Sequence, residues 1–323
     1  MKAAAYIGGT LGLALLLVLV VRSDLPAMLQ TLAQAGWSLL WLVPYRGVFF
    51  LCYALGWRLL LAPYDPRPRA GIDYLFWVTT VREGIDRLLP VASVGGGVIA
   101  VRLLRWRNLP SPAVAATVIT EILLTLIVAY LFTALGLVWL LHLNATGSQV
   151  HHVLLLFVLS LPVPIGFGLL LRHGSLFRRF ESALRPLVGA TAWTEGAATL
   201  DLELQHLLRR TKTLLTSSGL QFAAFLSGTF EVWLALRLFS HPVGIGVAFT
   251  LESMTQAVRH LAFIIPAGLG VQEAGLMLFG HALGISGELA LALSMAKRLR
   301  EVLCGLPALI SWQWLEAQRL KRH

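Results

Sequence analysis

The feature that most constrains this chain of 323 residues is a series of long apolar runs, which recur from residue 4 to residue 313. The mean hydropathy is +0.75 and only 13% of the residues are charged, whereas a soluble domain of this size has about a quarter. A stretch of about 20 apolar residues matches the hydrocarbon thickness of a bilayer. We therefore predict an all-α, polytopic integral membrane protein.

The net charge of +10 would also suit a nucleic-acid-binding protein. The basic residues, however, form short clusters between apolar runs, which is typical of cytoplasmic loops that face anionic lipid headgroups. We therefore predict such headgroups as partners, and no nucleic acid. Cys52 and Cys304 both lie inside apolar runs, so we expect neither a disulfide framework nor a zinc site.

Six apolar runs are predicted to cross the membrane fully. They are residues 4–21, 37–61, 112–142, 150–171, 213–239 and 288–313. We interpret the first as an uncleaved span rather than a signal peptide, because no small-residue cleavage site precedes Arg22. The run 112–142 is longer than one span needs, which predicts a tilted or partly interfacial helix.

Two further apolar stretches, 72–104 and 244–284, are each broken near the middle by proline and glycine. The residues at the breaks are Pro90, Gly95, Gly96 and Gly97, and Pro266, Gly268 and Gly270. We predict that each stretch enters the membrane and returns, as a re-entrant hairpin or a pair of broken helices.

The distribution of basic residues predicts the orientation. With the N-terminus inside, cytoplasmic segments hold 17 basic residues and outer segments hold only Arg22 and Arg237. The cytoplasmic residues are Lys2, Arg58, Arg67, Arg69, Arg102, Arg105, Arg107, Arg172, Arg178, Arg179, Arg185, Arg209, Arg210, Lys212, Arg319, Lys321 and Arg322. This bias requires each broken stretch to return to the membrane face from which it enters. The first stretch then enters from the cytoplasm and the second from outside. Both termini are then cytoplasmic, and we expect a bacterial inner membrane.

The two broken stretches predict an inverted repeat within a single transmembrane domain, 1–323. The first half is 1–142, the second is 213–323, and a cytoplasmic insert, 172–212, separates them. Interrupted segments at corresponding places in two halves are typical of a midplane transport site; the alternative is that two bends coincide by chance. The insert contains "LFRRFESALRPLV", which predicts an interfacial amphipathic helix, and it is too short for a catalytic domain.

Ionisable side chains inside the predicted spans are the candidate site. Each costs at least ~2.5–3.5 kcal/mol at the bilayer centre, so we expect them to face a protein interior or a wet cavity. The candidates for a substrate path are Arg82, Asp86 and Glu121 in the first half, and Arg259, His260, Glu273, Lys297, Arg298 and Glu301 in the second. The alternative is purely structural ion pairing. Because Lys297, Arg298 and Arg300 exceed the single charge of Glu301, an anion or a distant glutamate must offset them.

Three segments carry a resemblance to a known family: "LLPVASVGGGVIAVRLLRWRNL", "IIPAGLGVQE" and "AKRLREVLCGLPALI". They resemble the integral-membrane region of lysylphosphatidylglycerol synthases, and in particular its stand-alone, hopanoid-biosynthesis-associated members. The resemblance implies a protein that moves lipid between leaflets, and we expect the aminoacylating domain of the synthases to be absent. Gln272 stands where relatives often have arginine. Gly97 stands where, in relatives, an acidic residue often follows the paired glycines. These departures favour a less highly charged headgroup.

We therefore predict a flippase-like lipid transporter, for hopanoids or a related polar lipid, that uses a charged groove between the two hairpins. We expect no cofactor, no metal and no enzymatic activity, although the buried charges leave open acid/base chemistry on a lipid headgroup. A third alternative is a scaffold that binds lipid-biosynthesis enzymes through residues 172–212.

Overall fold

The computed structural model describes residues 25–89, 95–143, 154–155, 157–172, 194–261, 265 and 269–321, and among these there is no β-strand. The first half contains α2 (Leu25–Ala35), the 3-10 helix η1 (Gly36–Trp41), α3 (Leu42–Leu61), α4 (Ile72–Leu88), α5 (Gly95–Arg105) and α6 (Ser111–His142). The remainder contains α8 (Pro162–Arg172), α10 (Thr194–Leu208), α11 (Thr211–Leu238), α12 (Ile245–Leu261), α13 (Val271–Ala282) and α14 (Gly287–Leu320).

This architecture confirms the prediction of an all-α, polytopic membrane protein. Three described helical segments, Met28–Leu61, Ser111–His142 and Thr211–Leu238, are long and apolar enough to cross a bilayer. The run 112–142 forms one continuous helix of 32 residues, about 48 Å long, which exceeds the hydrocarbon thickness of a bilayer. The predictions for residues 4–21, Pro90, Pro266, Gly268 and the "LFRRFESALRPLV" helix lie outside the described residues.

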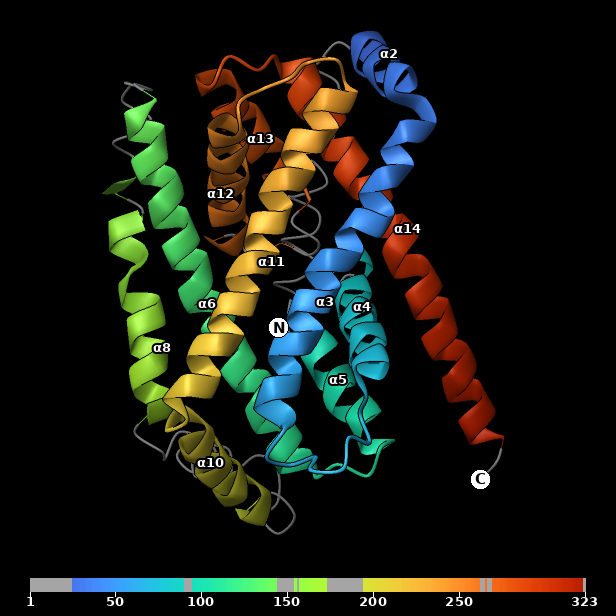
Figure 1. Cartoon of the computed structure of the whole chain (residues 1–323), viewed down its shortest axis with the longest axis vertical. Coiled ribbons are helices and arrows are strands. Elements are labelled where there is room, and N and C mark those ends of the chain that lie inside the picture. The colour runs from blue at the N-terminus through green and yellow to red at the C-terminus, as the bar shows by residue number, and fades with distance from the viewer. Residues whose placement is uncertain are drawn as a thin grey trace.

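Both broken stretches form pairs of helices that pack against each other, α4 with α5 and α12 with α13. At the open end of the first pair, the Tyr74 hydroxyl donates to the carbonyl of Leu103 (2.7 Å), and Arg69 donates to the carbonyl of Asn108 (3.2 Å). The chain therefore leaves this pair at the end where it entered. Figure 1 shows α4 and α5 in the lower half of the bundle and α12 and α13 in the upper half. The two pairs thus enter from opposite ends, as the charge count predicts.

The order and lengths of the helices repeat. Helices α3, α4, α5 and α6 have 20, 17, 11 and 32 residues, and helices α11, α12, α13 and α14 have 28, 17, 12 and 34. The packing repeats as well, because α4 packs on α14 as α12 packs on α6, while α3 and α11 pack on each other (Figure 1). This correspondence is what an inverted repeat produces.

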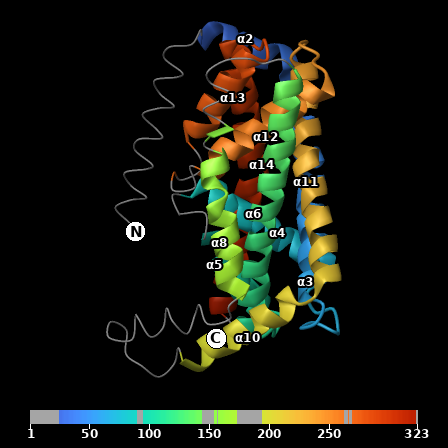
Figure 2. The same cartoon turned by 90° about the vertical axis from the view of Figure 1, so that its left-hand side faces the viewer.

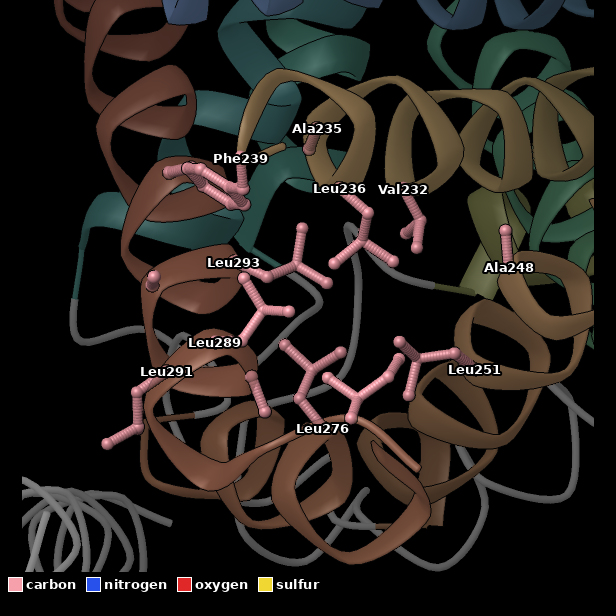
Figure 3. Packing of buried hydrophobic residues seen from close by; sticks show 14 of the residues in the cluster. Val232, Ala235, Leu236, Phe239, Ala248, Leu251, Leu276, Leu289, Leu291 and Leu293 are labelled. Atoms are coloured by element: carbon pink, nitrogen blue, oxygen red, sulfur yellow. The ribbon is translucent and has the colours of Figure 1, made fainter. Parts of the chain in front are cut away.

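Two of the apolar clusters among the described residues lie at the two ends of the bundle, and we call them the two apolar cores. In the first, Leu236, Leu276 and Leu293 converge from α11, α13 and α14 (Figure 3). The second contains Trp57 and Leu103, together with further buried residues of α3, α4, α5 and α6. On α14, the first core uses residues 289–296 and the second uses Ala308. The charged segment 297–301 therefore lies between two apolar cores.

The described basic segments collect at one end of the molecule. The end of α3, the start of α4, the end of α5, α10 and the end of α14 all lie at the lower end, whereas α2 lies at the upper end (Figures 1 and 2). These lower segments hold eleven of the thirteen described lysines and arginines that are not buried between the cores; the other two are Arg172 at the end of α8 and Arg237 at the end of α11. At this end, α10 buries Leu204 and Leu207 against α6 and α8, and Tyr64 donates to Glu203 (2.7 Å).

Candidate functional site: a buried charge cluster and a polar cavity

Among the described residues, fourteen Arg, Lys, Asp and Glu side chains gather between the two apolar cores, and we call them the buried charge cluster. Seven are basic: Arg46, Arg82, Arg87, Arg259, Lys297, Arg298 and Arg300. Seven are acidic: Glu83, Asp86, Glu121, Glu231, Glu252, Glu273 and Glu301. Their formal charges cancel, which makes burial of so many charges tolerable.

One series of ion pairs crosses the centre of the bundle. Arg46 of α3 lies 2.9 Å from Glu83 of α4 and 3.8 Å from Glu231 of α11. Glu231 in turn lies 3.0 Å from Arg300 of α14, whose guanidinium is 3.9 Å from Glu301. Glu231 therefore joins α3 to α14.

The series continues into the second helix pair. Glu301 lies 3.6 Å from Arg259 of α12 and 3.5 Å from Arg298, and Arg298 lies 3.2 Å from Glu273 of α13. Since Arg87 also contacts Glu83 (3.1 Å), an unbroken path of charged contacts links α4 to α13. The inner ends of both helix pairs are thus electrostatically connected.

Gln272 is an uncharged residue that hydrogen-bonds to members of this path. Its side-chain oxygen accepts from Arg259 (2.6 Å), and its amide nitrogen donates to Ser294 (2.8 Å). Ser294 then donates to Glu273 (2.9 Å), whose side chain is 0% exposed. An arginine at position 272 would place a further charge beside Arg259, so glutamine keeps the cluster balanced here.

Two other ion pairs join corresponding helices in the two halves. The cation lies on the first helix of the pair in the first half and on the last helix in the second half. In the first half, Arg82 of α4 donates to Glu121 of α6 (2.6 Å). In the second half, Glu252 of α12 accepts from Lys297 of α14. Each pair joins the first helix of a broken stretch to the long last helix of its half. The inverted repeat therefore extends to the charged residues.

A cavity of about 300 Å³ opens beside the cluster and is lined by α3, α4, α6, α11 and α12. Its polar lining consists of Arg46, Thr79, Arg82, Glu83, Asp86, Arg87, Glu121, Thr125, Glu252, Gln256 and His260, with Tyr53 beside them. The hydroxyl of Thr79 is buried and has no hydrogen-bond partner among the described residues. The apolar side chains Phe49, Ile122 and Leu126 also line it, and Ile122 is 39% exposed. The cavity therefore combines charged side chains with apolar ones, of which Ile122 reaches the outer surface of α6.

Such a cavity suits a polar headgroup attached to an apolar tail, and the comparison with known families agrees. The model of the lysylphosphatidylglycerol synthase TM region matches residues 7–307. The chain belongs to this family. No curated protein and no solved structure matches the chain. Membership of the lysylphosphatidylglycerol synthase TM-region family supports a multi-pass membrane protein related to the handling of lipid headgroups.

In this family member, the cavity brings together only some of the candidates from the sequence. Arg82, Asp86, Glu121 and His260 line it. The other candidates, Arg259, Glu273, Lys297, Arg298 and Glu301, are not part of its lining and belong to the ion pairs behind it. The positive excess on α14 is offset by distant glutamates, Glu231, Glu252 and Glu273.

The described residues at the two breaks have distinct roles. The amide of Gly96 donates to Asp86 (3.0 Å), and a Cβ atom at position 96 would lie 2.8 Å from the carbonyl oxygen of Arg82. Gly96 therefore lets α5 begin directly against α4. Gly270 has a positive φ of 73° immediately before α13, a conformation that glycine adopts without strain. Gly95 is the first residue of α5.

Sequence reasoning missed Glu231, which lies in the middle of the apolar run 213–239. The rule that a buried ionisable residue in a span needs a function or a partner applies to it directly. Arg46 lies inside the apolar run 37–61 and pairs with two carboxylates from other helices, those of Glu83 and Glu231. Within the described residues, no group of three or more His, Cys, Asp or Glu side chains is arranged to hold a metal ion.

Proposed function

We propose that this protein is a lipid transporter of the bacterial inner membrane, with both termini in the cytoplasm, that moves a polar headgroup through the cavity between the two helix pairs. The observation that carries the proposal is the cavity itself. Charged residues of both α4 and α12 line it, together with apolar side chains such as the exposed Ile122 of α6. A headgroup inside it would keep its hydrogen bonds while the tails stay in lipid.

The charges of the lining favour one class of headgroup. Three cations, Arg46, Arg82 and Arg87, stand against four carboxylates, Glu83, Asp86, Glu121 and Glu252. A multiply anionic headgroup would meet more negative than positive charge. The lining therefore favours a zwitterionic headgroup or a neutral one rich in hydroxyl groups, and we propose polar hopanoids as one candidate of this kind.

The inverted repeat supports a mechanism of alternating access. A second, much smaller cavity of about 10 Å³ lies between α14 and the pair α3–α4, where Glu83, Gly84, Arg300 and Cys304 line it. Because α6, α11 and α12 correspond to α14, α3 and α4, the small cavity is the counterpart of the α6 side of the large one. Arg46 and Glu83 line both cavities. We propose that the small cavity opens when the large one closes, and that these two residues contact the headgroup in both states.

The first test is mass spectrometry of the lipids that co-purify with gently solubilised protein. The double variant Arg82→Gln/Glu121→Gln removes a cavity ion pair without changing the net charge. The matched control is Arg102→Gln/Glu316→Gln, which removes an ion pair outside the cavity lining. We expect one lipid class to be enriched with the native protein and the control and lost in the cavity variant. The same bulk phospholipids in all three would contradict the proposal and favour a scaffold.

A further inference from the structure

A third pocket, near the end of α14 and far from the charge cluster, has the composition of an anion site. It has a volume of about 470 Å³ and is lined by Tyr74, Trp77, Trp106, Arg107, Leu315, Gln318 and Arg319. These residues belong to α4, to the turn after α5 and to the last turns of α14. The pocket therefore lies at the lower end of the bundle, where the basic segments collect (Figure 1).

Both arginines of this pocket are held over aromatic rings. The guanidinium carbon of Arg107 lies 4.3 Å from the centre of the Tyr74 ring, and that of Arg319 lies 4.6 Å from the centre of the Trp106 ring. Among the described residues, neither arginine forms an ion pair with a carboxylate. The nearby carboxylate of Glu316, one turn before Arg319 on α14, pairs with Arg102 instead. Stacking orients a guanidinium, and the N–H groups of Arg319, together with those of Arg107 that do not bond the Tyr74 hydroxyl, can bind an anion.

The aromatic walls are fixed by their own hydrogen bonds. Tyr74 donates to the carbonyl of Leu103 (2.7 Å), and the indole of Trp77 donates to the hydroxyl of Ser311 (2.9 Å). The rings of Tyr74 and Trp77 also contact each other, with centres 5.5 Å apart. The polar groups of these two walls are therefore already satisfied, and the unpaired polar capacity of the pocket resides mainly in the two arginines.

We infer that this pocket binds the phosphate of an anionic phospholipid, with the glycerol and upper acyl chains against the tryptophans. Arginine matches a phosphate with two parallel hydrogen bonds. Tryptophan and tyrosine prefer the headgroup level of a bilayer, and a basic surface at the cytoplasmic leaflet attracts anionic lipid. A lipid bound here would fix the end of α14 relative to α4 and α5. It is a resident lipid rather than the transported one, because the pocket shares no lining residue with the cavity.

The test is the binding of short-chain phosphatidylglycerol to the full-length protein in detergent, counted by native mass spectrometry. The variant is Arg107→Gln/Arg319→Gln. The matched control is Arg105→Gln/Arg209→Gln, which removes two exposed arginines of the same end that do not line the pocket. Phosphatidylcholine and inorganic phosphate are measured in parallel, and the cavity variant Arg82→Gln/Glu121→Gln is included to separate this site from the transport site.

We expect the affinity for phosphatidylglycerol to fall at least about tenfold in the pocket variant, since hydrogen bonds to charged groups are lost. The control and the cavity variant should keep it, and phosphatidylcholine should bind more weakly to the native protein. An equal loss in the control would overturn the proposal, because general surface charge would then explain binding. Inorganic phosphate that binds as tightly as the lipid would overturn it too, because the pocket would then hold a free anion.

Discussion

At the scale of single residues, the molecule depends on glutamates that neutralise cations from other helices. Glu231 contacts Arg46 and Arg300, which lie on two helices far apart in the chain. Both arginines are almost fully buried, and removal of the shared carboxylate would leave Arg46 with Glu83 alone and Arg300 with only the more distant Glu301, so the group would carry an excess positive charge. Buried ion pairs of this kind contribute little net stability as a unit, yet the loss of one partner is costly.

We predict that Glu231→Gln lowers the free energy of unfolding by about 3–5 kcal/mol. The control is Glu316→Gln, whose partner Arg102 has a side chain that is 56% exposed, and which should cost at most about 1 kcal/mol. Thermal unfolding of both variants in lipid nanodiscs measures the difference. Equal unfolding midpoints would show that Glu231 does not hold α3 and α14 together.

At the scale of elements, the two halves meet where small residues allow helices to touch. A Cβ atom at Gly84 of α4 would lie 3.2 Å from the Cα atom of Gly305 in α14. The corresponding contact between α6 and α12 places Gly136 against Ser253. These contacts position α4 and α12, and with them the charged lining of the cavity.

Replacement of Gly84 by leucine should therefore separate α4 from α14. We expect a loss of about 1–3 kcal/mol of stability, which is typical of an overpacked contact. Gly219→Leu is the control, because a Cβ atom at Gly219 in α11 would meet no other atom within 4 Å. Melting curves of the two purified variants compare them, and a midpoint for Gly84→Leu as high as that for Gly219→Leu would refute the close packing.

The elements were more predictable than their contacts. Apolar length predicts α6 and α11, and proline with glycine predicts the interruptions between α4 and α5 and between α12 and α13. The charge count predicts that the two pairs enter from opposite ends, because lipid asymmetry restricts where basic segments lie. Contacts such as that between Gly84 and Gly305 depend on residues 221 positions apart, and no local pattern encodes them. The same reason explains why the sequence nominated Arg298 and Glu273 for the substrate path, whereas the structure places them behind the cavity.

At the scale of the whole molecule, one cavity is open and its counterpart is nearly closed. Their volumes are about 300 Å³ and about 10 Å³. A transporter that alternates between two related states should exchange these volumes during each cycle. The ion-pair path from Glu83 to Glu273 offers a physical connection, since movement of α14 relative to α3 and α4 would disturb the contacts of Glu231 and Glu301.

A disulfide across the small cavity should stop this exchange. Thr80 of α4 and the native Cys304 of α14 both line it, so Thr80→Cys, in a Cys52→Ser background, should form a disulfide with Cys304 under mild oxidation. We expect lipid transport to cease on oxidation and to return with a reducing agent, because α14 can then move again. The variant Thr80→Cys/Cys304→Ser, which cannot crosslink, is the control. Unchanged transport by the crosslinked protein would exclude opening at this site.

The central claim, that a headgroup passes through the polar cavity, is tested most directly by lipid transfer between the leaflets of proteoliposomes. Lipids with a fluorescent acyl chain and a zwitterionic, neutral glycosyl or anionic headgroup would be used. A quencher that reaches only the outer leaflet would then measure how much of each lipid has been transferred. We predict transfer of a zwitterionic or neutral lipid by the native protein and by Arg102→Gln/Glu316→Gln. For Arg82→Gln/Glu121→Gln, we predict a rate at least about tenfold lower, since hydrogen bonds to charged groups contribute about 1.5–3 kcal/mol each. Transfer by this cavity variant at the native rate would contradict the account.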